Sequence, residues 1–426
     1  MRTVVVALLA LLAAAATASA AAACAPSLTR TELDAAIVAY DEDAAAAATA
    51  YGGLSIGELC VSEIADFNDL FYNLQTFNQG LENWDTSSAT SMDYMFYRTK
   101  NFNQPLSLDT SSVNSMESMF GGSSFNQPLS LDTSSVTTMA NMFDRASAFN
   151  QPLSLDTSSV TSMEGMFLSS GFNQPLKFDT SSVTTMVRMF SGSSFNQPLS
   201  LDTSSVTSMG QMFSNTLFNQ SLSLDTSSVT TMAHMFYAAQ SFNQPLSLDT
   251  SSVTTMSSMF FFSDFNQPLQ FDTSSVATMQ SMFYLAQSFN QPLKFDTSSV
   301  TSMATMFYAA WSFDQPLDFN VSGVGGDGFL QMFSETAALS SANRLIIRCK
   351  FESDNPLFDP VTEYGNSWFE AEIGACPPPP VDADGLSSAQ TIAIVGSLAG
   401  VLLCCLCVCA CALWRWRATL DFPRVS

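Results

Sequence analysis

The chain has 426 residues, of which 46% are hydrophobic, and a formal net charge of −24 at pH 7. Only 14 Lys and Arg accompany 38 Asp and Glu. This balance argues against a nucleic-acid partner, because phosphate binding needs a basic surface. The length would allow two or three ordinary domains, but most of the chain consists of a tandem repeat, which predicts one solenoid.

The first residues predict a secretory signal peptide, residues 1–23. Arg2 precedes an apolar run that ends at Ala16, and Ala18-Ser19-Ala20 supplies a small-residue cleavage pattern. A lipid-attached Cys24 is an alternative interpretation, although the leucine usual three residues before such a cysteine is absent. The signal predicts an extracytoplasmic chain with its amino terminus outside.

Residues 24–75 predict an amino-terminal cap. Thr31 can cap a helix that carries one apolar face: Leu33, Ile37 and Tyr40. Residues 62–71 follow the repeat's spacing of apolar residues loosely, which indicates a degenerate first coil. A terminal repeat must cover its outer face to remain soluble.

Residues 76–333 consist of a repeat of 23 or 24 residues. One clear copy begins Phe102-Asn103-Gln104-Pro105-Leu106-Ser107-Leu108-Asp109-Thr110-Ser111-Ser112-Val113, followed by Met116 and Met119-Phe120. A unit of this size cannot bury its own apolar face, so its core forms by stacking on neighbouring units. We therefore expect the Met and Phe stripes to form a continuous core. Length variation falls after Met-Phe, which places an exposed loop there.

The pattern within a unit predicts a leucine-rich-repeat-like coil with short parallel strands and short helical turns. Leu106-Ser107-Leu108 alternates as a strand with one buried face does, and Pro105 suits the first residue of a strand. The spacing of three and four from Met116 to Phe120 favours a single helical or 3₁₀ turn.

The polar residues that flank the predicted strand have structural roles in this interpretation. Asp109 and its equivalents should fix a turn by accepting hydrogen bonds from amides two or three residues on. Stacked coils would repeat these carboxylates roughly every 4.8 Å, so bridging by calcium is an alternative hypothesis. Asn103, Gln104 and their equivalents should form a second ladder.

Departures from the repeat create two glycosylation sequons. Ser221 replaces the proline and forms one with Asn219, while Asn320 replaces the aspartate and forms another with Ser322. We favour Asn320 as the glycosylation site, because Asn219 belongs to the expected ladder. Asp314 replaces the ladder asparagine in the same unit as Asn320.

The carboxy-terminal part predicts a cap, a stalk and a membrane anchor. Residues 334–376 do not follow the repeat but contain apolar residues, which predicts the cap. Residues 377–390 begin with four prolines, which predicts a stiff stalk. Residues 391–413 contain no charge, which predicts a transmembrane helix. Arg415 and Arg417 place residues 414–426 in the cytoplasm as a short tail.

The nine cysteines divide by predicted compartment. Four flank the repeats and permit three disulfide connectivities; we favour one staple for each cap, Cys24 with Cys60 and Cys349 with Cys376. Their long spacings do not suggest a zinc site. Cys409 and Cys411, near the cytosolic boundary, are palmitoylation candidates.

Two parts of each unit vary along the chain: the residues between the two methionines and the loop after Met-Phe. Glu117-Ser118 in one unit corresponds to Val187-Arg188 in another, and the only histidine, His234, stands at such a position. Variable residues on a constant frame are typical of a recognition surface. Neutral drift at exposed sites would produce the same pattern.

The unit Phe-Asn-Gln-Pro-Leu-Ser, Asp-Thr-Ser-Ser-Val-Thr and Met-x-x-Met-Phe resembles the BspA-like leucine-rich-repeat surface proteins of bacteria and protists, over roughly residues 52–333. That family usually has tryptophan before the aspartate, which only Trp84 keeps here. The resemblance implies a right-handed solenoid at the cell surface, often linked with adhesion. It implies no catalytic residues.

These features predict a single-pass protein of the plasma membrane or cell surface that binds extracellular protein or glycan. The alternative is a structural cell-coat component that self-associates without another ligand. We expect no enzyme activity and no cofactor, since the sequence offers no combination of nucleophile, base and orienting group.

Overall fold

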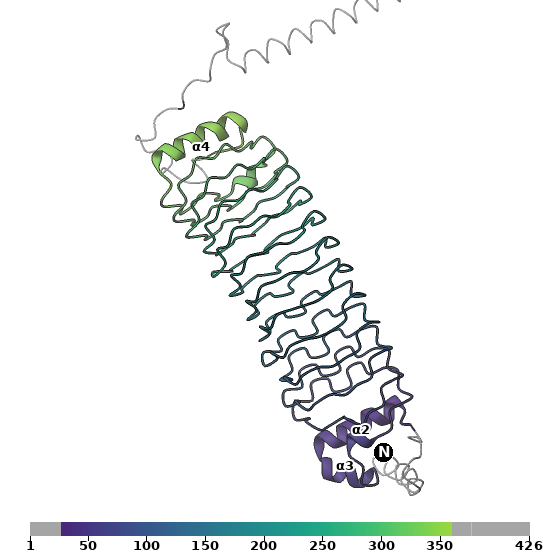
Figure 1. The fold of residues 1–426 in the computed structure, drawn as a ribbon. Coiled ribbons are helices and arrows are strands. Elements are labelled where there is room, and N and C mark those ends of the chain that lie inside the picture. Colours follow the sequence, from purple (N-terminus) through teal and green to yellow (C-terminus); the bar gives the residue numbers. More distant parts are fainter. Residues whose placement is uncertain (1–26, 360–375, 377–426) are drawn as a thin grey trace, which may run out of the picture. The chain divides into compact units, whose positions relative to one another are not determined.

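A stack of similar coils forms the main body of the protein. The computed structural model describes residues 27–359 and Cys376. The chain divides into two compact units, Met1–Ile373 and Gly374–Ser426, and of the second only Cys376 is described. In the first unit the coils lie between helices α2 and α3 at one end and α4 at the other (Figure 1). The tandem organisation predicted from the sequence is confirmed.

Helices α2 (Arg30–Glu42) and α3 (Ala44–Ala50) cover the first coil and are followed by the 3₁₀ helix η1 (Ile56–Glu58). The Thr29 hydroxyl accepts from the amide of Glu32, and the Glu32 carboxylate accepts from the amide of Thr29. This reciprocal pair makes Thr29 the cap, two residues before the predicted cap Thr31, and the helix begins at Arg30. Its buried face contains the predicted Leu33, Ile37 and Tyr40.

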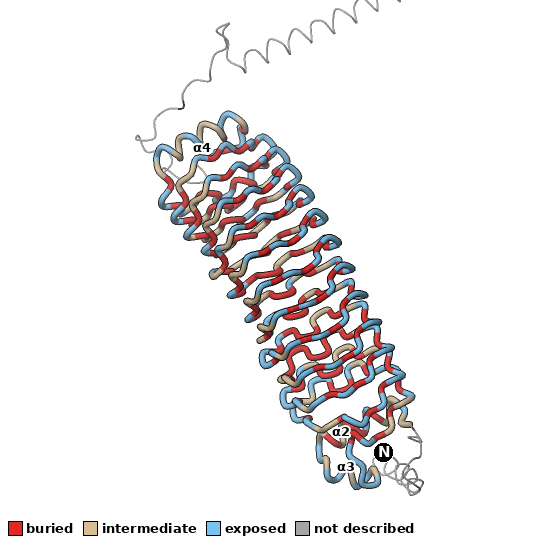
Figure 2. The backbone as a smooth tube through the Cα atoms, viewed as in Figure 1, coloured by how far each residue is buried: buried red, intermediate tan, exposed pale blue. Residues whose placement is uncertain are grey.

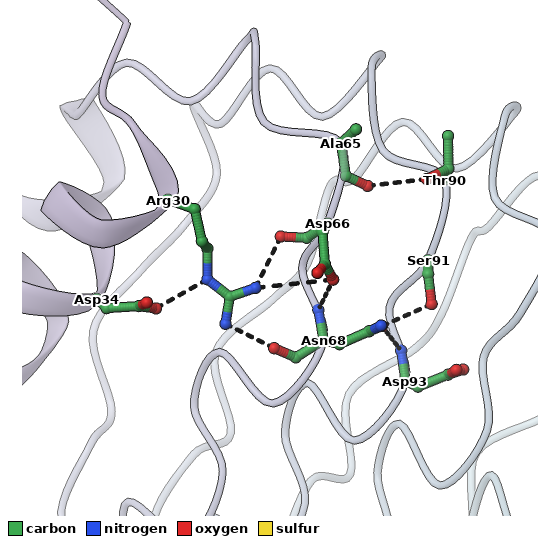
Figure 3. Close-up of polar contacts among 8 residues, drawn as sticks. All are labelled: Arg30, Asp34, Ala65, Asp66, Asn68, Thr90, Ser91 and Asp93. Carbon is green, nitrogen blue, oxygen red and sulfur yellow. Dashed lines mark hydrogen bonds and ion pairs between the residues drawn. The ribbon is translucent and has the colours of Figure 1, made fainter.

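Arg30 closes the outer edge of the first coil (Figure 3). Its guanidinium donates to the carbonyls of Asp66, at 2.8 Å, and Asn68, at 2.6 Å, and to the carboxylate of Asp34 at 2.8 Å. In the second coil the corresponding carbonyls, at Ser91 and Asp93, accept from amides of the first coil. The guanidinium thus replaces two amides that a preceding coil would supply.

Consecutive turns, rather than a helix, form the Met-x-x-Met-Phe segment of each coil. In the coil of Met116, the amides of Met119, Gly121 and Ser123 close turns on carbonyls three residues back. The amides between them donate to the next coil, for example Phe120 to Met142 at 3.0 Å. Alternate amides close these three-residue turns or donate to the next coil, so the segment satisfies its backbone without forming a helix. The predicted single turn is present, but the left-handed backbone at Ser118 keeps it from continuing as a 3₁₀ helix.

The predicted strands are wrong: within residues 27–359 no strand forms. Parallel pairing is limited to isolated bridges just before the first methionine, from Asp66–Ser91 to Thr278–Ser302. In the described coils no amide from Leu106 to Leu108 bonds to another coil's backbone. Each coil is therefore a loop of turns and extended segments, and the leucine-rich-repeat-like strand pattern does not apply.

The side of each coil that was predicted to form a strand differs from the Met-Phe side. Equivalent rings repeat at 5.7 Å on the Met-Phe side, as between Phe167 and Phe190. On the Leu-Ser-Leu side they repeat at 6.4 Å, between Phe271 and Phe295. The proline on this side has no amide to donate to a ladder, and no amide from Leu106 to Leu108 bonds to the backbone of another described coil.

Side chains link the coils on this wider side instead. The Asn196 side-chain oxygen accepts from the amide of Asn219 at 2.9 Å, and this bond repeats from coil to coil, which confirms the predicted asparagine ladder. The Thr203 hydroxyl, buried, donates to the carbonyl of Asp225 at 2.7 Å. The equivalent threonines do the same, a role that the sequence did not reveal.

Replacing Asn196 by Ala should lower the free energy of unfolding by about 1–1.5 kcal/mol, because two donors, from Asn219 and Gln220, lose their acceptor. Asn196→Asp should lose less, since Asp314 fills the ladder position naturally and accepts in the same way. Urea denaturation of both variants checks this. If Asn196→Ala and Asn196→Asp lost the same free energy of unfolding, the side-chain oxygen would not be the source of the stability.

Two columns of phenylalanine rings form the centre of the coil stack. Phe190 lies 4.3 Å from Phe195 of the other column, and 5.7 and 5.8 Å from its own neighbours Phe167 and Phe213, measured between ring centroids. The methionines and valines around the rings are also buried. Figure 2 shows buried segments along the inside of every coil, so the predicted Met and Phe core is confirmed.

The last coils of the stack are covered by η2 (Gly326–Phe329) and α4 (Ser341–Asp354). Asp314, in the ladder position, accepts from the amide and hydroxyl of Ser340, the N-cap residue of α4, at 2.9 and 2.8 Å. These bonds hold the pKa of Asp314 below its ordinary value. The carboxylate also lies beside the positive end of the helix dipole, which explains this departure from the repeat.

The helices of residues 27–359 are all too short or too polar to cross a bilayer. The predicted transmembrane helix is therefore not seen, and residues 391–413, where it was expected, lie outside the described residues. The predicted signal peptide, stalk and cytoplasmic tail also lie outside the described residues.

Candidate recognition surface

The variable positions of the repeat gather on one surface, which we call the variable face. It consists, in each coil, of the two residues between the methionines and the two after Met-Phe; in the coil of Met116 these are Glu117, Ser118, Gly121 and Gly122. Contacts between coils show that they share a surface. Tyr94 donates to the Glu117 carboxylate of the next coil at 2.7 Å, and its ring lies 5.6 Å from that of Tyr97.

Left-handed backbone fixes how the variable face presents its side chains. The second residue between the methionines has φ of 53° at Ser118, 57° at Arg188 and 59° at His234. The second residue after Met-Phe is also left-handed, as at Ala238 and Phe262. Such a conformation is costly for residues other than glycine, and the inter-coil amide bonds hold it in every coil. The frame thus stays constant while the side chains differ.

The variable face has a charged half and an uncharged half. Each of its segments in the coils from 92 to 192 contains a charged residue: Asp93, Arg98, Glu117, Asp144, Arg145, Glu164 and Arg188. The segments 232–238, 256–262, 279–285 and 303–309 contain none. Burial lowers the pKa of His234 below its ordinary value, so this histidine is neutral at pH 7. One solenoid therefore offers two chemically different surfaces.

A row of four stacked aromatic rings occupies the uncharged half. Tyr237, Phe261, Tyr284 and Tyr308, here the aromatic strip, all directly follow Met-Phe in successive coils. Their centroids are 4.6, 4.5 and 4.7 Å apart and the rings lie within 12° of parallel. In the coils before them the same position is occupied by Ser191 and Ser214, among others. Sequence reasoning missed this strip, although four consecutive Met-Phe-aromatic triplets signal it.

A row of exposed carboxylates lies on another edge of the coils. Asp109 accepts from the amide of Ser111 at 3.0 Å and from its hydroxyl at 2.7 Å, which confirms the predicted turn. These bonds lower the pKa of Asp109 and of its equivalents. In the part of the chain that the structure describes, no three His, Cys, Asp or Glu side chains are grouped to hold a metal ion.

Replacing Asp179, Asp202 and Asp225 together by Asn should flatten the loss of stability in acid without changing the melting temperature at neutral pH. Asn accepts the same bonds, as Asn320 does from Ser322 at 3.1 and 2.7 Å. The folded carboxylates have lowered pKa values, so below about pH 4 the unfolded chain takes up protons first.

The stability that these carboxylates contribute is thus present above about pH 4 and lost as the pH falls through the lowered pKa values. Thermal melts followed by circular dichroism between neutral pH and about pH 2 would measure this. A triple variant that loses stability in acid as steeply as the parent chain would contradict the assignment.

The remaining predicted site residues are placed as follows. Cys60, Cys349 and Cys376 are disulfide-bonded, while Cys24, the predicted partner of Cys60, lies outside the described residues. Asn320 is exposed, and half-buried Asn219 takes part in the asparagine ladder, where it accepts from Asn243. Glycosylation of either remains a prediction. The palmitoylation candidates Cys409 and Cys411 lie outside the described residues.

Stacked coils, closed by different helices at their two ends, define a tandem-repeat protein that presents its surface on a regular frame. A family model described as "Mycoplasma protein of unknown function, DUF285" matches residues 43–151, 123–223, 169–261 and 246–344. The chain belongs to this family. No curated protein and no solved structure is significantly similar to it.

Proposed function

We propose that this is a cell-surface protein whose variable face binds an extracellular protein or glycan. The observation that carries the proposal is the constant left-handed frame, which holds a different set of side chains in each coil. Rigid elements with variable outward side chains are how repeat proteins build binding surfaces. Binding of this kind fits an adhesion role, as the resemblance to BspA-like surface proteins implies.

Two further observations support display outside the cell. The amino-terminal residues have the pattern of a secretory signal. Cys60, Cys349 and Cys376 are disulfide-bonded, and disulfides form and persist in oxidising compartments.

The closed ends favour recognition over the alternative of a coat built end to end. Arg30 occupies two carbonyls of the first coil, and α4 is fastened to the last coils through Asp314. Each end is thus filled by the chain's own residues, so a further copy could not continue the stack without displacing them.

Binding of the full-length chain to arrays of glycans and cell-surface proteins tests the proposal. We expect a selective ligand that engages the charged half of the variable face. The quadruple change Glu117→Gln, Arg145→Gln, Glu164→Gln and Arg188→Gln should then weaken binding at least about tenfold. Asp179→Asn with Asp202→Asn, on the carboxylate edge, is the matched control and should bind as the parent chain does.

A chain that binds nothing on either array would contradict the proposed function. So would a ligand whose affinity is unaffected by the quadruple change but falls with the control, because recognition would then belong to the carboxylate edge.

A further inference from the structure

We propose that the aromatic strip is an interface through which two copies of this chain associate. The strip consists of Tyr237, Phe261, Tyr284 and Tyr308. This inference does not depend on the proposed function, since it concerns the uncharged half of the variable face and a different partner.

The strip has the composition of an interface core. Its four rings are half-buried, and beside them in sequence Phe262 and Trp311 have exposed fractions of 38% and 50%. The cores of protein–protein interfaces are enriched in aromatic residues and depleted of charged ones. Exposed apolar patches on soluble surfaces mark such contacts. The same face in the coils from 92 to 192 has charged residues and only one aromatic pair, Tyr94 with Tyr97.

The ring geometry favours a protein over a sugar. The rings lie parallel and cover one another's faces, with centroid distances of 4.5–4.7 Å, so they present their edges. The Tyr308 hydroxyl donates to the Glu335 carboxylate at 3.2 Å. Sugars stack on ring faces, which are covered here. Ring edges carry partial positive charge and pack favourably against the faces of other aromatic rings. Exposed Phe262 and Trp311 of a second copy would offer such faces.

Charge and spacing point to a second copy of the same chain. With a net charge of −24, two copies repel each other wherever acidic residues meet. The four segments that carry the strip contain no Asp, Glu, Lys or Arg. Glu335 accepts from the Tyr308 hydroxyl at 3.2 Å at one end of the strip, so contact centred on Tyr237, Phe261 and Tyr284 brings the fewest like charges together. A partner that touches every ring must also repeat at the spacing of the coils. A second copy of the chain has coils of the same spacing. In a two-fold symmetric dimer, each copy contributes the same surface patch to the interface.

The test is the molar mass of the full-length chain, measured by light scattering over a range of concentrations. A mild detergent is included because residues 391–413 are an uninterrupted uncharged segment. We expect a concentration-dependent dimer. Changing Tyr237, Phe261, Tyr284 and Tyr308 together to Ser should raise its dissociation constant at least about thirtyfold. Ser occupies this position naturally at Ser191 and Ser214, so the coils tolerate it.

Two further variants test whether the aromatic strip forms the interface or only stabilises the coils. Tyr72→Ser with Tyr97→Ser removes the stacked pair at the same position of the first coils and should leave the dimer unchanged. Ser257→Glu with Gln280→Glu keeps every ring but adds charge where Glu117 and Glu164 stand in other coils. This pair should weaken the dimer at low salt and recover with added salt.

A parent chain that stays monomeric at every concentration would overturn the proposal. A dimer that survives both the serine and the glutamate changes would do the same, because association would then use another surface.

Discussion

Replacing Phe190 by Ala should lower the free energy of unfolding by about 3–5 kcal/mol. The ring is fully buried and contacts Phe195 of the other column and Phe167 and Phe213 of its own, all within 6 Å between centroids. Each coil interacts only with its neighbours, so a cavity in the coil of Phe190 also weakens the coupling between the coils before it and the coils after it. Urea denaturation should show a lower midpoint and a broader, stepwise transition.

Phe262→Ala is the matched control for this change. The ring is 38% exposed, and Ala238 and Ala309 occupy the same left-handed position in other coils. Its removal should cost less than about 1 kcal/mol. If Phe190→Ala and Phe262→Ala had equal effects, the continuous ring columns would not be the main source of stability.

Replacing Arg30 by Met should destabilise the amino-terminal cap by about 2–3 kcal/mol. Two carbonyls, those of Asp66 and Asn68, lose charge-assisted donors, each bond being worth about 1.5–3 kcal/mol before allowance for solvent. The side chain is 31% exposed, so water compensates for part of the loss. Limited proteolysis should cut within α2 and α3 earlier than in the parent chain, while the central coils stay resistant.

Arg30→Lys separates charge from geometry. An ammonium group cannot span two carbonyls and the Asp34 carboxylate as the planar guanidinium does, so Lys should recover only part of the loss. Full recovery by Lys would mean that charge alone holds the cap. An unchanged proteolysis pattern in Arg30→Met would mean that the apolar face of α2 is sufficient.

The sequence predicted the parts of the fold that depend on periodicity and on local chemistry. Repeat length and buried Met-Phe pairs follow from the period, because a unit of this size has its core only between neighbours. The turn at Asp109 follows from the reach of a short carboxylate to an amide two residues on. These features need no knowledge of how far apart the coils lie.

The features that were wrong or missed depend on which groups of neighbouring coils bond to one another. Leu106-Ser107-Leu108 alternates over only three residues, and such a short pattern does not distinguish a paired strand from an extended segment. No backbone ladder forms on this side of the described coils, and Asn196, Thr203 and their equivalents link the coils instead. The aromatic strip is visible only when the residues after Met-Phe are aligned across coils, because within one coil each is a single half-buried ring.

The near identity of the contacts between coils has a consequence for how such a chain can change over generations. A long run of nearly identical coding units invites unequal recombination, which adds or deletes whole units. Because the Asn, Thr and Phe columns make the same contacts in successive coils, a gained or lost coil leaves these contacts intact between the same two end caps. The number of coils can therefore drift by whole steps, and with it the lengths of the charged and aromatic surfaces, without passing through an unfolded intermediate.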